Sequence, residues 1–444
     1  MRMFFGDQTD RHDRWRVILA SMVLVCALGV VVSPQVQLDV CGCKNNPATL
    51  GDFDTASPAP FPPGITLTGI NTIDIQLPPD GVMVFNSINV RERPPYVGGY
   101  GMTVRFIRNA ANTPVTLLVS GNVTIGQYAT LTVAGVGGVA GYDVGSGGLG
   151  GPGGFRGGDG AYQLVNFSRM GGAGSGPGGG AGGNDTYFAN GHGANATFVG
   201  APDLLPLIGG SGGGGGASTS ASAGCGAGGG GGGGGALLIA ADGSINFGVS
   251  SQIIADGATG GSYGGNPGCA SSGGGGSGGA VRLLATTVSG AGNIYARGGS
   301  GAVGPVAKGF IRVEALNNTM TVAQTDPIAS RAPGPGPIVN PVTPTVAITA
   351  VGGRPVPQPP QGGLGNVDLV LAAPGQTDVA LSTSGVPSGT TVNVTVKPRV
   401  GGAPIVTPVT LTSCDPNGAC LANVTFNLAA GGYFIEARAT FSTP

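Results

Sequence analysis

Long runs of glycine interrupt this chain, mostly between residues 133 and 301, and they include the unbroken stretches 212–216 and 228–235. Glycine has no side chain to pack and loses more backbone freedom on folding than any other residue. We therefore expect that these runs cannot form a core and must be loops that leave some other structure. They are the parts of the chain that we expect to be mobile.

The segments between the glycine runs repeat a pattern of three short apolar strands with Gly, Asn, Asp or Ser at the corners. The strands fall at 115–119, 123–125 and 131–133, then 236–240, 245–247 and 252–255, then 280–284, 288–290 and 293–296, and finally 310–314. A unit of this size cannot bury its apolar face alone, so the units must stack. The pattern predicts an all-β fold, a parallel β-helix with long glycine-rich loops, over residues 111–325.

An antiparallel sandwich is a weaker interpretation of these residues, because every long loop follows the third strand of its unit. A helical fold is excluded, since no segment shows a 3.6-residue apolar period.

Two further regions of strand flank the glycine-rich part. Residues 65–90 alternate apolar and polar residues around a Pro-Pro-Asp-Gly turn, and we expect an N-terminal strand-rich cap over residues 35–110. Residues 326–345 are a proline-rich linker. Residues 346–444 contain about seven strand candidates with regular turns, which predicts an immunoglobulin-like or fibronectin-type β-sandwich.

The N-terminus has the layout of an export signal. Arg11, Arg14 and Arg16 precede the uncharged apolar stretch 17–32, which ends at Ser33 and Pro34. Residues 1–34 are therefore predicted to be a signal peptide. An uncleaved membrane anchor is the alternative, although 16 apolar residues fall slightly short of the roughly 20 that a span needs. Either version places the protein outside the cell or on its surface.

The composition limits the partners. Only 9% of the residues are charged and the net charge is -1, so there is no basic face for nucleic acid. The expected partners are polysaccharide or other surface proteins, with membrane contact only through the N-terminal segment.

The cysteines suggest disulfides, because six of the seven remain once the predicted signal is removed. Cys414 and Cys420 flank a turn-forming sequence and are predicted to pair. Cys225 and Cys269 lie in successive glycine-rich loops and are the second candidate pair. Cys41 and Cys43 stand too close for an easy mutual bridge, and we expect a local or intermolecular disulfide there rather than a metal site.

The residues do not assemble a recognisable catalytic site or cofactor site. Gly191-His192-Gly193 and Asn184-Asp185-Thr186 look like fragments of a polygalacturonase site, but paired aspartates are missing and His192 is expected to be a solvated loop residue. The isolated aspartates, Asp242 among them, are explained as turn caps. The aromatic residues of the second loop could contact a ligand or could pin the loop to the strands, and pinning is favoured. They are Tyr142, Phe155, Tyr162, Phe167, Tyr187, Phe188 and Phe198.

Four segments carry a resemblance to known proteins: LPPDGVMVFNSINV, FIRNAANTPVTLLVSGNVTI, GGPGGFRGGDG and GSGGAVRLLATTVSGAGNIYARGGSG. In this order, over residues 73–315, they resemble a group of poorly characterised exported bacterial proteins with glycine-rich loops on a predicted β-helix and sometimes a C-terminal sandwich. The resemblance implies an extracellular or surface location and carries no activity. The glycine runs also look like those of mycobacterial glycine-rich surface proteins, but the leader of those proteins is missing here.

These observations favour a secreted or surface-displayed structural or adhesive protein that is not an enzyme. A polysaccharide lyase or hydrolase on a β-helix, and a membrane-anchored assembly subunit, remain the alternatives. The enzyme alternative requires a carboxylate cluster on one face of the coil.

Overall fold

The computed structural model of this chain describes most residues from Asp39 onward. The described ranges are 39–43, 50–58, 60–93, 101–141, 145–161, 170–184, 191–218, 225–264, 270–301, 303, 307–338, 345–358, 367–398, 404–415 and 419–440. The predicted signal or anchor lies outside them. The described part is built from strands and one short 3-10 helix, Val322–Gln324, so the predicted all-β character is confirmed.

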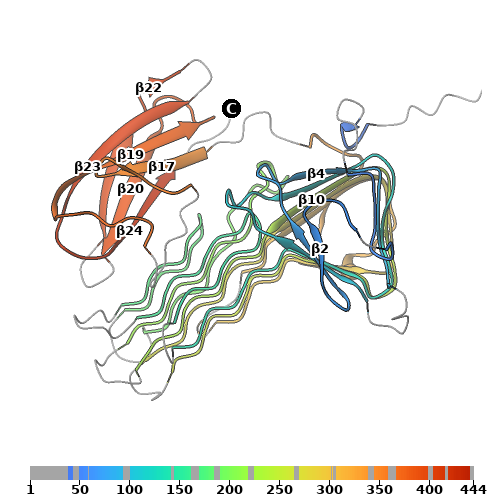
Figure 1. The fold of residues 1–444 in the computed structure, drawn as a ribbon, viewed down its shortest axis with the longest axis horizontal. Coiled ribbons are helices and arrows are strands. Elements are labelled where there is room, and N and C mark those ends of the chain that lie inside the picture. Colours follow the sequence, from blue (N-terminus) through green and yellow to red (C-terminus); the bar gives the residue numbers. More distant parts are fainter. Residues whose placement is uncertain are drawn as a thin grey trace, which may run out of the picture. The chain divides into compact units, whose positions relative to one another are not determined.

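Strands β1 to β16, nearly all paired in parallel, stack coil upon coil into a structure that we call the trunk (Figure 1). The strands of its early coils are β1 (Asp52–Asp54), β2 (Ile65–Gly69), β3 (Thr72–Gln76), β4 (Val82–Phe85), β5 (Ser87–Val90), β6 (Thr103–Ile107), β7 (Val115–Val119), β8 (Val123–Ile125) and β9 (Thr130–Thr132). The later strands are β10 (Ala236–Phe247), β11 (Gln252–Ile254), β12 (Ala280–Gly290), β13 (Asn293–Tyr295), β14 (Phe310–Asn318), β15 (Thr325–Asp326) and β16 (Ser330–Ala332).

Each coil of the trunk passes through three ladders. In the first, β4, β7, β10, β12, β14 and β16 pair in parallel, and in the second β1, β5 and β8 lead into the later halves of β10 and β12. The chain turns between these two ladders inside β10, where the register shifts between Ala241 and Ser244. The third ladder, which we call the third sheet, runs β3, β6, β9, β11, β13, β15. The predicted parallel pairing is confirmed.

The trunk core follows from the alternation in the strands, because alternate side chains of a strand point to opposite faces. In the third sheet Ile73, Val104, Leu131, Ile253 and Ile294 are fully buried and occupy one position in successive coils. They belong to a single apolar cluster that runs from Phe53 to Ala329. Strands before residue 111, in the region expected to be an N-terminal cap, contribute to the same cluster and ladders as the rest of the trunk. Its one antiparallel pair is β2 with β3.

The outer face of the first ladder is covered by two segments from distant parts of the chain. Asp39–Cys43, which we call the strap, packs Val40, Cys41 and Cys43 against Val84, Leu118, Leu238 and Leu284. Residues 336–338 lie over the later coils, where Gly336 N–H donates to Glu314 and Arg282 donates to the Pro337 carbonyl. The beginning of the predicted proline-rich linker is therefore bound to the trunk.

The glycine-rich excursions form an ordered bundle, which corrects the expectation that they are mobile loops without a packed interior. Figure 1 shows them as wavy traces that run side by side away from the trunk. The bundle comprises 133–141, 145–161, 170–184, 191–218, 225–235, 255–264, 270–279, 296–301 and 307–309. Neighbouring segments are joined by backbone hydrogen bonds that recur at every third residue, for example Gly135, Gly138 and Gly141 donating to Asp256, Thr259 and Ser262. A three-residue repeat with no internal hydrogen bonds is the geometry of polyproline II-like chains.

The C-terminal region is a separate set of antiparallel strands. Its strands are β17 (Thr345–Val351), β18 (Arg354–Pro355), β19 (Gly375–Ser384), β20 (Thr391–Pro398), β21 (Ile405–Thr410), β22 (Ser413–Cys414), β23 (Cys420–Leu428) and β24 (Tyr433–Ala439). They form two sheets, in the orders β18-β17-β19-β23-β22 and β21-β20-β24. Val379 and Phe426 from the first sheet and Val392 and Val394 from the second share one buried cluster, so the two sheets enclose a core.

Candidate interaction surface

Residues 225–235 are the centre of the bundle and are hydrogen-bonded to six neighbouring segments. Their N–H groups donate in rotation to three of them: Gly231 to Gly274, Gly232 to Val136 and Gly233 to Phe155, at 2.9–3.0 Å. Their carbonyls accept from three others, including a bond from Gly213 to Gly231. A chain with three residues per turn that is surrounded by six neighbours is packed hexagonally. The buried interior of this packing is the hydrogen-bonded backbone itself.

Only glycine can occupy this centre. A Cβ added at Gly231 would lie 1.9 Å from the Ala258 carbonyl oxygen, at Gly232 2.0 Å from that of Leu149, and at Gly233 1.9 Å from that of Gly210. A Cβ at each of these three successive glycines would thus be directed at a different neighbouring segment, and each would collide with the backbone of that segment. This explains why the sequence has its unbroken glycine runs at 228–235 and 212–216, which are the enclosed segments.

The outer segments of the bundle need glycine only where a residue points inward. In 133–141 a Cβ at Gly135 or Gly138 would collide with the central segment, whereas one at Gly137 has only the Thr259 carbonyl near it, at 3.5 Å. The intervening Val136 and Val139, three residues apart, face outward and are 56% and 49% exposed. The outer segments therefore present side chains at a regular spacing of three residues.

One flat layer of the bundle continues the third sheet directly. Its three segments, 133–141, 255–264 and 296–301, leave from the ends of β9, β11 and β13. The ladder of hydrogen bonds does not break at the strand ends: Val133 donates to Ile254, then Gly135 to Asp256 and Gly138 to Thr259. The spacing of the hydrogen bonds changes from two residues in the strands to three in the bundle, while each segment keeps the same neighbouring segment. We call these three segments the outer layer.

The charged side chains of the third sheet and the outer layer form ion pairs, either with one another or, for Asp326, with Lys308 of the bundle segment 307–309. Asp74 pairs with Arg105 at 2.7 Å, Asp256 with Arg297 at 2.6 Å, and Asp326 with Lys308 at 2.5 Å. The hydrogen bond to Asp256 raises the pKa of Arg297 above its ordinary value. The Arg297 guanidinium also lies over the Tyr295 ring, 4.1 Å from its centroid. The paired charges leave this face electrically neutral.

A row of neutral polar side chains crosses the same face of the third sheet. Thr72, Thr103, Thr130, Gln252 and Asn293 occupy equivalent positions in five successive coils. All five are half-buried and point away from the trunk core, since they alternate with the buried isoleucines, valine and leucine of each strand. In the part of the chain that the structure describes, no hydrogen bond to their side-chain hydroxyl or amide groups is found. We call these residues the polar row.

The aromatic residues considered as ligand contacts are only partly placed. Tyr142, Tyr162, Phe167, Tyr187 and Phe188 lie outside the described residues. The Phe155 ring packs against Gly176, where an added Cβ would come within 2.7 Å of it. The Phe198 ring stacks on Phe310 of β14, with centroids 5.4 Å apart. These two rings hold bundle segments against each other and against the trunk.

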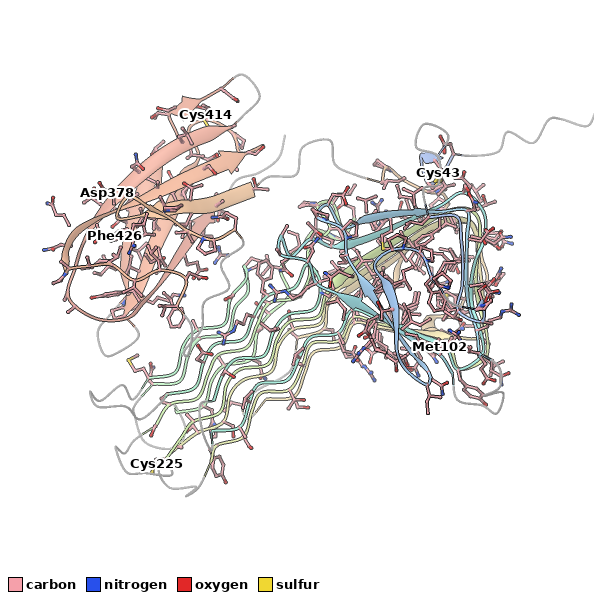
Figure 2. All side chains as sticks on the ribbon, viewed as in Figure 1. Cys43, Met102, Cys225, Asp378, Cys414 and Phe426 are labelled. Atoms are coloured by element: carbon pink, nitrogen blue, oxygen red, sulfur yellow. A yellow bond between two sulfur atoms is a disulfide. The ribbon has the colours of Figure 1, made fainter. Side chains whose placement is uncertain are left out.

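The cysteines are paired where they are described (Figure 2). Cys414 and Cys420 form the predicted disulfide across the β22–β23 hairpin. Cys41 and Cys43 are also bonded to each other, which corrects the expectation that they are too close. Gly42, at φ +67°, turns the chain between them so that the two side chains meet. Cys225 is disulfide-bonded at the end of the bundle remote from the trunk, and Cys269 lies outside the described residues.

The histidine and aspartates that resemble catalytic residues in the sequence are bonded to other groups of the protein where they are described. His192 Nδ1 accepts the Ser272 N–H at 3.2 Å, and Asp159 is buried against Arg156 and the Gly147 N–H. Asp203 accepts from Leu205 N–H, as expected of a turn cap. Asp143 and Asp185 lie outside the described residues. The described carboxylates of the trunk and bundle are mostly joined to arginine or lysine rather than to one another.

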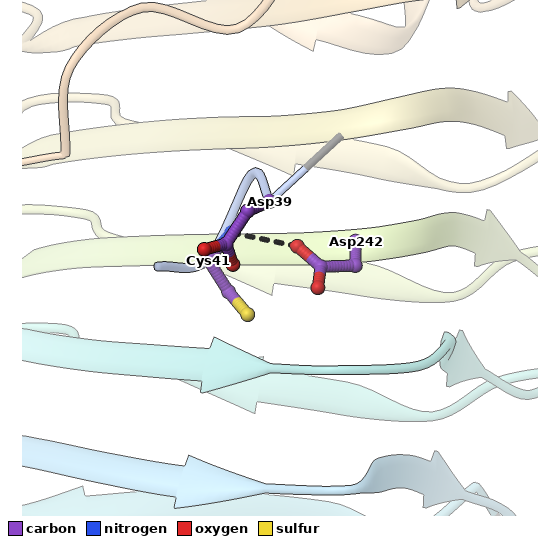
Figure 3. A group of neighbouring side chains, drawn as sticks. All are labelled: Asp39, Cys41 and Asp242. Carbon is purple, nitrogen blue, oxygen red and sulfur yellow. Dashed lines mark hydrogen bonds between the residues drawn. The ribbon is translucent and has the colours of Figure 1, made fainter. Parts of the chain in front are cut away.

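One group within the described residues combines three side chains of metal-ligating type: Asp39, Cys41 and Asp242 (Figure 3). The Cys41 sulfur is bonded to Cys43 and is therefore not a thiolate that could bind a metal. Asp242 Oδ1 accepts the Cys41 backbone N–H at 2.8 Å. Asp242, interpreted from the sequence as a corner cap, thus attaches the strap to the trunk.

The sequence did not reveal a buried ion pair on the first ladder. Arg282 and Glu314 face outward at neighbouring positions of β12 and β14, and their side chains are only 1% and 2% exposed beneath residues 336–338. Their 2.8 Å contact is supplemented by Arg312, 2.7 Å from the same carboxylate. The sequence shows three charged residues within these two apolar strands, Arg282, Arg312 and Glu314, but the segment that covers them could not be predicted.

Comparison with known proteins gives no relative: no protein-family model, curated protein or solved structure matches this chain. The described residues contain no helix that is long and apolar enough to cross a membrane.

Proposed function

We propose that this protein is an exported structural or adhesive protein of the bacterial surface, with a parallel β-helix trunk and an immunoglobulin-like C-terminal sandwich. The observation that carries the proposal is the glycine bundle, whose interior is hydrogen-bonded backbone. A catalytic site needs chemical groups held at one point, whereas this bundle fixes a broad layer and spaces side chains over it. Presentation of an extended rigid surface is the task that such a layer supports.

The low charge agrees with this proposal. The chain has 20 basic and 21 acidic residues in 444, and on the third sheet and outer layer the charges pair internally. A neutral, hydrogen-bonded layer has little electrostatic attraction for nucleic acid or for anionic lipid. It is suited to contact with neutral polymers or with other neutral proteins.

The test is to express the full chain with a C-terminal tag in a bacterial host and to treat intact cells with protease. Appearance of the tag in the medium, or its removal by protease outside intact cells, supports the proposal. Retention of a protected protein inside the cells overturns it. The purified protein is then incubated with polysaccharides, and reducing ends and unsaturated products are assayed. Product release would favour the lyase or hydrolase alternative.

A further inference from the structure

We infer that the outer face of the third sheet is a binding site for a neutral polysaccharide, with the polar row as its hydrogen-bonding line. This inference rests on the proposed surface function and names the class of ligand. The polar row places one hydroxyl or amide group per coil, in the order Thr, Thr, Thr, Gln, Asn, along the stacking direction. Neighbouring strands lie about 4.8 Å apart, so the row is a regular series of hydrogen-bonding groups.

The row is free to bind because its polar groups are not used within the protein. No hydrogen bond to the side chains of Thr72, Thr103 or Thr130 is found in the described part of the chain. Hydroxyl and amide groups both donate and accept, which matches the hydroxyl groups of a sugar. Threonine in a strand also has restricted side-chain rotation, so binding costs little side-chain entropy.

The charges around the row select for a neutral ligand. The charged side chains of this face are held in three ion pairs, Asp74–Arg105, Asp256–Arg297 and Asp326–Lys308, the last of them to a lysine of segment 307–309. An acidic polysaccharide would have to break these pairs to gain its own, whereas a neutral chain leaves them intact. Tyr295, next to the row on β13, adds an aromatic ring with Arg297 on one side of it, and aromatic side chains combine an apolar face with a polar tip.

The surface extends beyond the sheet, which suits a long polymer rather than a single sugar. The outer layer continues β9, β11 and β13 in register, and its outward side chains are Val136, Val139, Thr259, Ser262 and Ser300. The valines lie on segment 133–141 and the hydroxyl side chains on the other two segments, whose Asp256 and Arg297 are paired with each other. A polysaccharide chain, with its CH faces and hydroxyl edges, has both kinds of group along its length.

The test is a pull-down of the full-length protein with cellulose, xylan, mannan and chitin, and with polygalacturonate and alginate as anionic probes. We expect depletion by at least one neutral polysaccharide and not by the anionic ones. The double variant Thr103→Val/Thr130→Val removes two hydroxyls and keeps the side-chain shape, and it should weaken the binding about tenfold, because each hydrogen bond contributes a few-fold. Thr124→Val, at an equally half-buried outward position of the second ladder, is the matched control and should bind like the wild type.

Circular dichroism and a thermal midpoint for each variant establish that it is folded before binding is compared. Binding by anionic probes alone, no binding to any neutral probe, or wild-type binding by the double variant would each overturn this inference. None of these results touches the export assay, so failure of the binding site is distinguishable from failure of the proposed surface location.

Discussion

A single methyl group in the centre of the bundle should be far more damaging than the same group at its edge. The perturbation is Gly231→Ala, and the control is Gly137→Ala in the outer layer. Alanine is the smallest change that adds a Cβ. At Gly231 this atom would lie 1.9 Å from the Ala258 carbonyl oxygen, and at Gly137 the nearest atom is 3.5 Å away.

The size of the effect follows from what must move. The Ala258 carbonyl would have to retreat by about 1.5 Å to reach an ordinary contact of 3.4 Å. That carbonyl accepts from Gly276 N–H, and the Ala258 N–H donates to Gly232, both at 2.9 Å. Overpacking costs about 1–3 kcal/mol, and each weakened hydrogen bond about 1 kcal/mol. We therefore expect Gly231→Ala to destabilise the bundle by about 3 kcal/mol.

Gly137→Ala should have the opposite sign. Where the native backbone accepts alanine, losing glycine reduces the freedom of the unfolded chain and stabilises by about 0.4–1 kcal/mol. Hydrogen exchange followed by mass spectrometry, on peptides that cover 225–235, reads the two effects locally. A loss of about 3 kcal/mol is a factor of about a hundred in the opening equilibrium. Equal protection in both variants would show that the bundle does not pack as we describe and would refute the reasoning.

Three further predictions concern the trunk and the C-terminal sheets. Burial alone would raise the pKa of Glu314, but hydrogen bonds from Arg282 and from its other partners outweigh it and hold that pKa below the ordinary 4.5. The ionised Glu314 therefore stabilises the fold above pH 4.5, and this stabilisation is lost as the pH falls through the lower pKa of the folded protein. Thermal midpoints measured from pH 6 to 2 should fall less steeply in Glu314→Gln, which lacks this carboxylate, than in the wild type. The double variant Cys414→Ser/Cys420→Ser opens a short loop and should cost the C-terminal sheets about 2 kcal/mol in urea unfolding, and an unchanged midpoint would contradict it. Asp242→Ala should release the strap, so that limited proteolysis cuts near residue 43 faster than in the wild type, while the trunk stays folded by circular dichroism.

The trunk was predictable because its strands carry their own signal. Apolar residues alternate in segments such as 73–77 and 123–125, and polar corners mark the turns, so the three-strand repeat could be read without any structure. What the sequence could not give is the pairing across the long excursions. The register that aligns Thr130 with Gln252 follows only once the 121 intervening residues are folded, since the excursion between them determines where the next coil begins.

The bundle was missed for a different reason. A buried segment is recognised in a sequence by its apolar side chains, and a packed interior that consists of backbone has none. A signal was nevertheless present, because Ser146, Leu149 and Pro152 recur at every third position in an outer segment. The same third position is filled by glycine in 212–216 and 228–235, the segments that lie inside. Side chains at every third position thus mark the outer segments of a bundle, and unbroken glycine marks the inner segments.

The threefold rotation of hydrogen bonds also limits how this protein could change in length. Adding one or two residues to a bundle segment would turn every later residue by a third or two thirds of a turn, and an outward side chain such as Val139 would face the central glycines. Adding three residues restores every direction and lengthens the segment by about 9 Å. Variants of this protein with longer or shorter reach should therefore differ by whole triplets, inserted together in the outgoing segment and in its returning partner.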